Sequence, residues 1–347
     1  MAYKAIENYP DKRIFFLSEM IHNPHVNKDL LENGIRFLMD THGNPLINWD
    51  EVTNEDVVLI PAFGTTLETK EKLNEIGLLI AEYDTTCPFV AKVWNRSDKI
   101  AQRGFSLVVH GKPSHEETRA TFSHAKDKAP AIIVKNLEET KQLAKYMLGE
   151  LPEHDFYTDF EGRFSADFKL ENLNKLGVVN QTTMLATETQ EIANYLKGVL
   201  EQKFGGTDIK NHFADTRDTL CYATNDNQQA TYALLNQANA DLAIVVGGYN
   251  SSNTTHLVEL CEEQLPTYFI SSASKISDVN SITHFNIRQQ KEITTNEFLA
   301  VNNKPLNIII TSGASCPDSM VETVIMKLKG CFKNTLAVED VLKAALN

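Results

Sequence analysis

Two short segments each end in a lone cysteine directly before a predicted helix. Cys87 closes the sequence DTTC (84–87), Cys221 closes DTLC (218–221), and no other cysteine lies within three residues of either. A thiolate is a nucleophile and a good ligand for soft metals such as those of iron–sulfur clusters. Unpaired cysteine is also among the most often buried residue types, so packing at a helix start is an interpretation of equal weight. The two segments alone leave metal binding, nucleophilic catalysis and packing open.

The composition is that of an ordinary globular protein with reduced cysteines. Of the 347 residues, 42% are hydrophobic and 23% are charged, and the longest apolar runs have the length of strands rather than membrane spans. A net charge of -13 without a Lys/Arg-rich block disfavours nucleic acid as a partner. Five cysteines without a close pair argue against a disulfide framework. The start carries no basic, apolar leader, which predicts a cytoplasmic protein without a membrane partner.

Short apolar runs alternate with amphipathic stretches along nearly the whole chain. Continuously apolar strands between helices are typical of α/β proteins with parallel sheets. The predicted strands are 13–17, 56–61, 106–111, 131–136, 177–181, 242–248, 267–270 and 307–313. The predicted helices include 67–76, 88–103, 188–203 and 225–239. Residues 147–175 break this alternation with acidic and aromatic residues, and we expect them to form a surface insertion.

One unit occurs twice in full and a third time in part. After Cys87, and again after Cys221, the predicted order is helix, strand, polar turn, helix. The segments MAYKAIENYP, RIFFL and SEMIHNPHVN follow the same order at the start, without a cysteine before them. We therefore expect the chain to begin inside the first of three repeats. The sequence predicts three α/β lobes, residues 1–86, 87–216 and 217–347, with the insertion in the second.

Three such lobes facing one centre would bring their cysteines together. The active loops of parallel α/β units lie at the carboxyl ends of the strands, beside helix N-termini. Iron–sulfur clusters are held by thiolates that can come from distant loops. A four-iron cluster with only three protein thiolates leaves one iron open, as a metal needs in order to bind a substrate.

Seven segments resemble the signature blocks of one known family. They are SEMIHN (18–23), DTTCP (84–88), HGKPSHEET (110–118), NQTTML (180–185), DTLCYAT (218–224), YNSSNT (249–254) and SGASCPD (312–318). In this order they resemble the 4-hydroxy-3-methylbut-2-enyl diphosphate reductases, the IspH/LytB family. The resemblance implies a three-lobed α/β fold around a central 4Fe–4S cluster. It also implies that the substrate's hydroxyl is removed to give isopentenyl and dimethylallyl diphosphate, the last step of the non-mevalonate isoprenoid route.

The resemblance also implies roles for individual residues. Cys87 and Cys221 match the second and third cluster ligands, and Glu117 matches the acid that relays protons. The substrate-binding residues that it implies are His22, His115, Thr182, Ser251, Ser252, Asn253 and Ser315. Several of these lie at predicted helix starts, where backbone N–H groups and the helix dipole favour phosphate. Without the resemblance, Glu117 would be interpreted as a solvated carboxylate and His22 as a surface turn residue.

The electron donor is implied only as a class. The sequence contains no glycine-rich dinucleotide fingerprint and no P-loop, so bound NAD(P)H is not expected as the source of electrons. The resemblance implies a carrier protein such as ferredoxin or flavodoxin.

Two positions depart from the family pattern. The family's first cysteine precedes a helix that resembles MAYKAIENYP, and no residue precedes Met1 here, so the third cysteine ligand is expected to be absent from this chain. No replacement is expected from the remaining cysteines, Cys261, Cys316 and Cys331. Phe63 in PAFGTT (61–66) stands where many members have a further histidine, and a phenyl ring cannot donate a hydrogen bond to phosphate. Thr65 or Thr66 could replace that contact.

Two other functions remain open on the sequence. A cysteine hydrolase would use Cys87 or Cys221 as nucleophile with His115 or His22 as base, which leaves the repeated Asp-Thr-x-Cys unexplained. A degenerate, cluster-free α/β protein that binds a diphosphate without reducing it is the stronger alternative. Brown colour in the anaerobically purified, full-length protein would support the cluster, whereas a colourless protein that still binds diphosphates would support the degenerate module.

Overall fold

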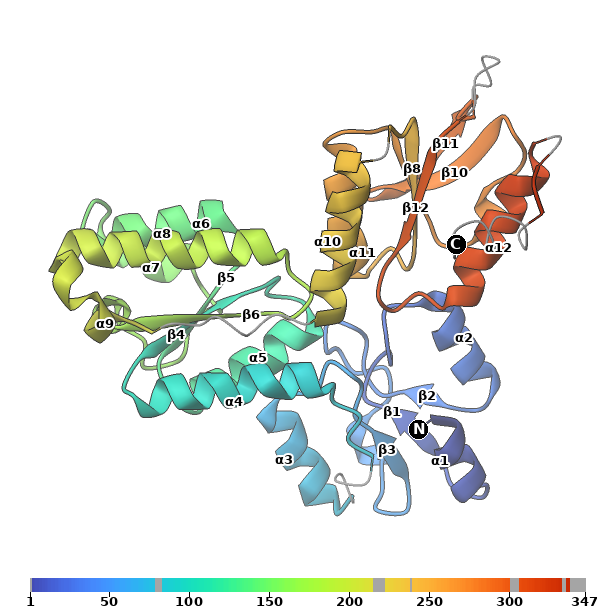
Figure 1. The fold of residues 1–347 in the computed structure, drawn as a ribbon. Helices are drawn as coiled ribbons and strands as arrows, with labels where there is room; N and C mark the ends of the chain where they lie inside the picture. The colour runs from blue at the N-terminus through green and yellow to red at the C-terminus, as the bar shows by residue number, and fades with distance from the viewer. Residues whose placement is uncertain are drawn as a thin grey trace, which may run out of the picture. The chain divides into compact units, whose positions relative to one another are not determined.

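Strands and helices alternate along the chain, as the sequence predicts (Figure 1). The computed structural model describes residues 2–78, 83–214, 222–237, 239–299, 306–332 and 335–337. The chain divides into two units, Met1–Asn225 and Asp226–Asn347, and each unit has apolar clusters of its own. The predicted α/β class with parallel sheets is confirmed. The predicted lobe boundaries at 86 and 216 stay a prediction.

The first unit contains a small parallel sheet near the N-terminus. Its strand order is β2-β1-β3, and β1 pairs in parallel with both neighbours. The strands are β1 (Ile14–Phe16), β2 (Arg36–Phe37) and β3 (Val57–Leu59). The helices are α1 (Ala2–Asn8), α2 (Pro24–Glu32) and α3 (Leu67–Ile76), with a 3-10 turn η1 (Trp49–Glu51). Every residue of β1 and β3 is buried, which explains their purely apolar sequences.

A second parallel sheet in the same unit has the order β5-β4-β6-β7. Its strands are β4 (Ser106–His110), β5 (Ala131–Val134), β6 (Leu176–Asn180) and β7 (Phe213–Ala214). Its helices are α4 (Pro88–Gln102), α5 (Glu116–Lys126), α6 (Leu137–Met147), α7 (Glu153–Asp159), α8 (Ala186–Phe204) and α9 (Ile209–His212), with 3-10 turns η3 (Leu170–Asn174) and η4 (Gly206–Asp208).

Helices cover both faces of this second sheet. Figure 1 shows α6 and α8 on one face and α4 and α5 on the other. Val108 of β4 belongs to the cluster under α6 and α8, whereas Leu107 and Val109 belong to the cluster under α4 and α5. Successive side chains of a strand point to opposite faces, so a strand buried on both sides needs the continuous apolar run seen in SLVVH.

The second unit contains a third parallel sheet and a separate hairpin. The sheet has the order β12-β8-β9, with β8 (Leu242–Val246), β9 (Thr267–Ile270) and β12 (Ile308–Ser312). The hairpin pairs β10 (Ser281–Asn286) with β11 (Lys291–Asn296) in antiparallel register. The helices are α10 (Tyr222–Gln237), α11 (Ser252–Glu262) and α12 (Asp318–Gly330), with a 3-10 turn η5 (Ala273–Lys275).

The three parallel sheets share one topology. In each sheet the first strand of the repeat is central, with the second strand of the repeat on one side and the third on the other. The three orders are β2-β1-β3, β5-β4-β6 and β9-β8-β12. The helix before the central strand is α1, α4 or α10, and the helix after it is α2, α5 or α11. The internal repeat inferred from the sequence is therefore present in the fold, and the loops that follow β1, β4 and β8 are equivalent positions.

The prediction that residues 147–175 lie on the surface is wrong for their aromatic side chains. Phe156, Phe160 and Phe168 are at most 3% exposed and belong to the core cluster of the second sheet. Phe156 stacks on Phe160, Phe164 and Phe168 at ring-centroid distances of 5.4, 5.5 and 5.9 Å. The acidic residues of this segment concealed a phenylalanine at every fourth position, which is an apolar face.

The β10–β11 hairpin was not predicted from the sequence. Its alternation of buried and less buried residues is confined to β10, and most of β11 is exposed. Among the described residues, no helix has both the length and the apolar character needed to cross a membrane.

Candidate active site

Three rings meet where β1, β3 and β4 end. His22 lies in the turn after β1, Phe63 follows β3, and His115 is the N-cap of α5 after β4. The Nε2 atoms of His22 and His115 are 3.1 Å apart. Phe63 stacks on His22 with ring centroids 4.4 Å apart and meets His115 edge-on at 5.5 Å. Phe63 therefore packs against both imidazoles, at the position where the family resemblance would place a further histidine.

The hydrogen bonds determine which nitrogen of each histidine carries a proton. The backbone N–H of Glu117 donates to Nδ1 of His115 at 3.2 Å, so Nδ1 is unprotonated. Burial holds the pKa of His115 well below its usual range, and His22 lowers that pKa further. Neutral His115 then carries its proton on Nε2 and donates it to Nε2 of His22. The proton of His22 is left on Nδ1, which lies 3.5 Å from an oxygen of Glu19.

Glu117 is a buried acid whose pKa suits proton transfer at neutral pH. The residue is 1% exposed, and its Oε1 accepts a hydrogen bond from the backbone N–H of Thr182. Burial raises the pKa of Glu117 to about 7, although its contacts with Thr182 act in the opposite direction. An acid with a pKa near the working pH is the most effective proton donor, because a large fraction is protonated and the proton is still released readily.

Parallel pairing of β4 with β6 explains why Glu117 meets Thr182. Gln181 follows β6, its backbone N–H donates to the carbonyl of His110 at the end of β4, and its Oε1 accepts from Thr118 Oγ1 at 2.8 Å. A Cβ atom on Gly111 would lie 2.4 Å from Thr118 Oγ1 and 3.0 Å from Gln181 Cβ. Glycine is therefore needed at 111 for the start of α5 to reach the end of β6.

Cys87 has the surroundings of a ligand rather than of a core residue. It is a half-buried free thiol at the N-cap of α4, where Pro88 begins the helix. Its backbone N–H donates to the carbonyl of Ala62 at 2.9 Å, which ties it to the loop of Phe63. The partial positive charge of a helix N-terminus favours an anionic ligand atom there. Cys87 thus fits a thiolate ligand of an iron–sulfur cluster.

Of the two predicted cysteine ligands, only Cys87 lies among the described residues. Cys221 lies outside the described residues, and within those residues no group of three or more His, Cys, Asp or Glu side chains is placed to hold a metal ion. Cys261 and Cys316 are buried in the second unit, and burial raises the pKa of their thiols to about 12 and about 11. Cys331 is half-buried against the apolar cluster of the same unit. None of these three resembles a metal ligand.

The second unit carries a cluster of polar side chains at the start of α11. Ser251 is the N-cap, and its Oγ accepts from the backbone N–H of Thr254 at 3.3 Å and from Thr254 Oγ1 at 3.0 Å. Asn253 is 4% exposed, and within the described residues neither its Oδ1 nor its Nδ2 has a hydrogen-bond partner. Buried amides are normally satisfied, so this amide is available to a ligand.

Two glycines hold the neighbouring strand ends close to α11. A Cβ on Gly247, after β8, would lie 2.6 Å from Thr254 Oγ1, and one on Gly313, after β12, would lie 2.0 Å from it. Ser252 is buried in the first turn of α11, and half-buried Ser315 follows Gly313. The four predicted residues of this unit therefore lie at adjacent strand ends beside a helix N-terminus, which is a favourable site for phosphate.

A family model described as "LytB protein" matches residues 1–329. The chain belongs to this family. A 4-hydroxy-3-methylbut-2-enyl diphosphate reductase from Synechococcus sp. (strain WH7803) is 41% identical over 330 residues, which cover 94% of this chain and 80% of the relative. A protein of the same name from Picosynechococcus sp. (strain ATCC 27264 / PCC 7002 / PR-6) is 39% identical over 94% of this chain and 79% of its own length.

Solved structures support the fold of this LytB family member. The E-1-hydroxy-2-methyl-but-2-enyl-4-diphosphate reductase from Plasmodium falciparum has a TM-score of 0.66 at 21% identity, covering 94% of this chain and 83% of that one. The relatives carry the name of a reductase, so they do not favour the alternative of a degenerate binding protein.

Sequence reasoning missed several residues that build this site. Gly111, Thr118 and Gln181 fix the position of Glu117, and Glu116 is buried beside it. The available signal was the composition of α5, EETRATFSHAK, which lies between two strongly apolar strands and yet lacks an apolar stripe. A helix whose buried face is polar and small indicates a site rather than a core.

Proposed function

We propose that this chain is a 4-hydroxy-3-methylbut-2-enyl diphosphate reductase that produces isopentenyl and dimethylallyl diphosphate in the last step of the non-mevalonate pathway. In the overall reaction the carbon–oxygen bond to the substrate's hydroxyl breaks and a carbon–hydrogen bond forms. Two electrons and two protons enter, and one molecule of water leaves. The reaction therefore needs a source of electrons, a source of protons and a site for the diphosphate.

The observation that carries this proposal is the acid at Glu117. A hydroxyl leaves as water only when it is protonated, and Glu117 has a pKa of about 7 in a fully buried position. The backbone N–H of Thr182 holds the carboxyl group in one orientation. Glu117 donates the proton to the departing oxygen, and Thr182 contacts the substrate beside it.

Each unit carries a group of neutral donors suited to the substrate's diphosphate. His22 and His115 are buried and linked through their Nε2 atoms, and His115 is neutral in the free protein. In the second unit, Ser251, Ser252, Asn253 and Ser315 supply hydroxyl and amide donors at the start of α11. Local donors at a helix N-terminus can bind an anion even though the protein has a net charge of -13.

Cys87 and Cys221 are the proposed ligands of a 4Fe–4S cluster. When bound, the cluster supplies the two electrons to the substrate. Cys87 is suited to this role because its thiol is half-buried at a helix N-terminus and lies outside the apolar cores.

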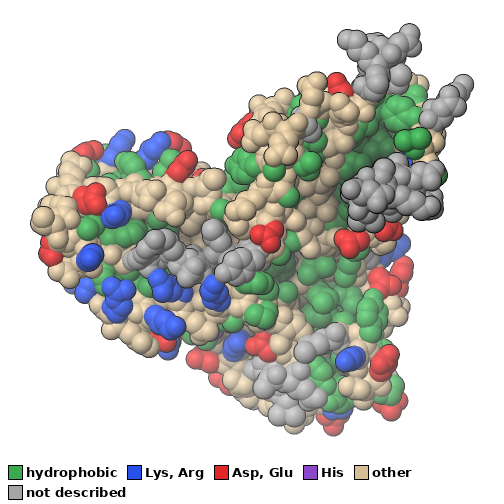
Figure 2. Space-filling view, viewed as in Figure 1, with side chains coloured by type: hydrophobic (Ala, Val, Ile, Leu, Met, Phe, Trp, Pro, Cys, Tyr) green, Lys and Arg blue, Asp and Glu red, His purple; other side chains and the backbone are tan. Residues whose placement is uncertain are grey.

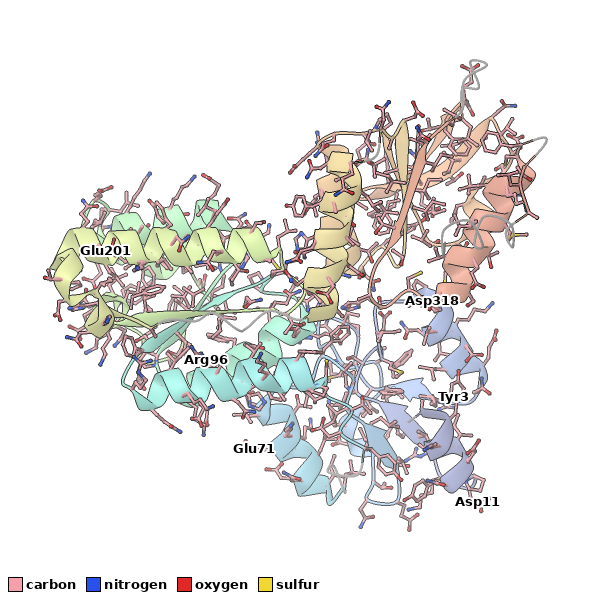
Figure 3. All side chains as sticks on the ribbon, viewed as in Figure 1. Tyr3, Asp11, Glu71, Arg96, Glu201 and Asp318 are labelled. Carbon is pink, nitrogen blue, oxygen red and sulfur yellow. The ribbon has the colours of Figure 1, made fainter. Side chains whose placement is uncertain are left out.

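Electrons reach this site from a small acidic carrier such as a ferredoxin or flavodoxin. The helix that begins after Cys87 carries Lys92, Arg96 and Lys99, followed by Arg103 at its C-cap. Figure 2 shows Lys and Arg side chains gathered in this part of the surface, and Figure 3 labels Arg96 on α4. A basic strip on an acidic protein attracts an acidic partner to one place, so the rate of reduction by such a carrier should fall as salt is raised.

The test is turnover by Glu117→Gln against Glu71→Gln. Glutamine is nearly isosteric and keeps a hydrogen-bond acceptor but cannot deliver a proton, so kcat should fall at least 100-fold, in the range that general acid catalysis supplies. Glu71 is exposed on α3, and its replacement should leave kcat unchanged (Figure 3). The wild-type kcat should decline above about pH 7. A loss smaller than tenfold in Glu117→Gln would reduce Glu117 to a positioning residue.

A further inference from the structure

Glu116, the first residue of α5, is a buried acid without a role in the proposed reaction. Its side chain is 5% exposed, and among the described residues neither carboxyl oxygen has a hydrogen-bond partner. An unpaired buried carboxyl group costs folding free energy, because burial removes its hydration without replacing it. Such a group calls for a functional explanation.

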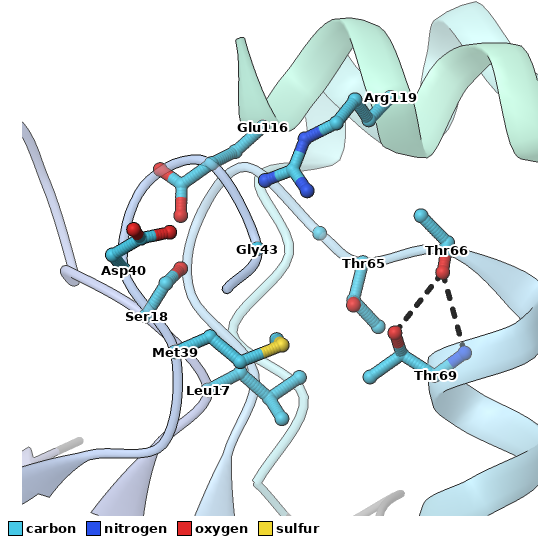
Figure 4. Close-up of a pocket in the computed structure, with 11 residues that line it drawn as sticks. Leu17, Ser18, Met39, Asp40, Gly43, Thr65, Thr66, Thr69, Glu116 and Arg119 are labelled. Carbon is cyan, nitrogen blue, oxygen red and sulfur yellow. Dashed lines mark hydrogen bonds between the residues drawn. The ribbon is translucent and has the colours of Figure 1, made fainter. Parts of the chain in front are cut away.

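Glu116 faces a polar cavity. The cavity has a volume of about 100 Å³, enough for several water molecules. Ser18, Asp40, Thr65, Glu116 and Arg119 supply polar groups to its wall. Figure 4 shows the side chains of Ser18, Asp40 and Glu116 pointing toward one another. The carboxyl group of Glu116 therefore has room for water on one side.

The cation nearest along the helix is held in a fixed position. Arg119 lies one turn after Glu116, and its Nη2 donates to the carbonyl of Thr41 at 2.9 Å. A Cβ on Gly43 would lie 2.0 Å from Nη1 of Arg119, so the loop at 40–44 closes over the guanidinium only with glycine there. Arg119 can stabilise a negative charge on Glu116 when one forms.

On its other side, Glu116 faces the histidine pair. Its Oε2 lies 3.8 Å from Nε2 of His22, the atom that accepts from His115. The pKa of Glu116 is raised to about 8, mainly by burial and also by Glu19 and Asp40, against opposing contributions from Ser18 and Arg119. At neutral pH the group is therefore mostly a neutral acid beside two neutral imidazoles.

We propose that Glu116 is a proton store for His22, releasing its proton to that imidazole when a diphosphate group arrives. The O–H bond of Glu116 breaks and an N–H bond forms at Nε2 of His22, with no change in electron count. His115 turns its own Nε2–H from His22 to a phosphate oxygen, which frees the nitrogen. Rotation of the carboxyl group or one cavity water closes the 3.8 Å gap. This inference rests on the proposed function, since it assumes that His22 contacts the diphosphate.

Proton transfer from Glu116 makes His22 positively charged only when an anion is bound. Two imidazolium rings with nitrogens 3.1 Å apart would repel each other, and burial disfavours both charges. After the transfer, the His22 cation faces the diphosphate while the new Glu116 carboxylate lies near Arg119. Glu116 acts through His22 and is therefore a positioning residue.

Proton counting during pyrophosphate binding tests the proposal. Calorimetry at about pH 7.5, in buffers of different ionisation enthalpy, gives the number of protons taken up by the reconstituted full chain. In the wild type the proton on His22 comes from Glu116. The protons taken up from solvent should therefore be only those that pyrophosphate itself gains on binding. Glu116→Gln must take its proton from solvent, so it should take up about one more. Because this variant takes one proton from solvent with each ligand bound, its affinity should fall about tenfold for each unit by which the pH is raised.

Three further variants complete the test. Glu19→Gln changes the other carboxyl group facing His22 and should keep the wild-type proton count. Glu116→Asp restores an acid and should restore the count, which a purely structural role would not require, and it also serves if Glu116→Gln fails to fold. Equal counts in the wild type and Glu116→Gln would overturn the proton store while leaving the reductase function intact. Unchanged pyrophosphate binding in His22→Ala would overturn both the diphosphate site and this inference.

Discussion

Replacing Gly111 by alanine tests the contact that holds Glu117 against Thr182. Gly111 does not have a positive φ, so alanine suits its backbone and the effect comes from the new Cβ alone. That atom would lie 2.4 Å from Thr118 Oγ1 and 3.0 Å from Gln181 Cβ, and both neighbours are fully buried. Thr118 must move, which breaks its 2.8 Å hydrogen bond to Gln181.

The size of the effect follows from two costs. Overpacking of a buried contact costs about 1–3 kcal/mol. A buried hydrogen bond that loses its partner costs about 1–3 kcal/mol more. The free energy of unfolding of the first unit should therefore fall by about 4 kcal/mol. The value of kcat should also fall, because Glu117 directly precedes Thr118 in the chain and is displaced when Thr118 moves.

Urea unfolding followed by tryptophan fluorescence measures this stability. Both tryptophans of the chain, Trp49 and Trp94, lie in the first unit and report on it. The matched control is Gly198→Ala in α8, where an added Cβ meets nothing within 4 Å. Alanine in a helix interior should stabilise by up to about 1 kcal/mol.

A double-mutant cycle with Thr118→Ala identifies the cause. Thr118→Ala removes the atom that the new Cβ would strike, so the double variant should be more stable than the sum of the two single losses by at least about 1 kcal/mol. Additive losses, or a Gly111→Ala protein within about 1 kcal/mol of the wild type, would refute the reasoning.

Three other outcomes are expected. Cys87→Ser should lose iron and visible absorbance after anaerobic reconstitution, because a serine hydroxyl is a poor substitute for a thiolate; a fully loaded variant would contradict the ligand assignment. The raised pKa of Glu117 gives stability that is fully present below pH 4.5 and lost as the pH rises through 7. Glu117→Gln should lack this loss of about 3 kcal/mol. An equal loss of stability between pH 5 and about pH 8 in the wild type and in Glu117→Gln would contradict the raised pKa of Glu117. Asn253→Leu should preserve or raise the stability of the second unit but weaken pyrophosphate binding; unchanged affinity would remove Asn253 from the site.

The sheets were predictable because their strands are buried on both faces. Short, continuously apolar runs such as LVV at 107–109 and LAIVV at 242–246 are typical of such buried strands. Pro88 after Cys87 marks the start of α4 in the sequence. Turn residues were less predictable, since the contact between His22 and His115 joins loops that only the folded sheets bring together.

Some failures came from ignored patterns rather than from missing information. The phenylalanines between 156 and 168 recur at helical spacing, but the acidic residues around them suggested a surface. Glu116 could not be separated from Glu117 by sequence, because adjacent helix-start carboxylates have the same local signal. Their different surroundings, a cavity and His22 for one and Thr182 for the other, arise only from packing.

Product identification tests the central claim most directly. The full chain, reconstituted with iron and sulfide without oxygen, is given (E)-4-hydroxy-3-methylbut-2-enyl diphosphate and a chemical one-electron reductant, and the products are separated by mass spectrometry. The proposed function predicts isopentenyl and dimethylallyl diphosphate, each carrying one new hydrogen from the solvent. Protein that holds a reducible cluster and binds the substrate but returns it unchanged would contradict that function.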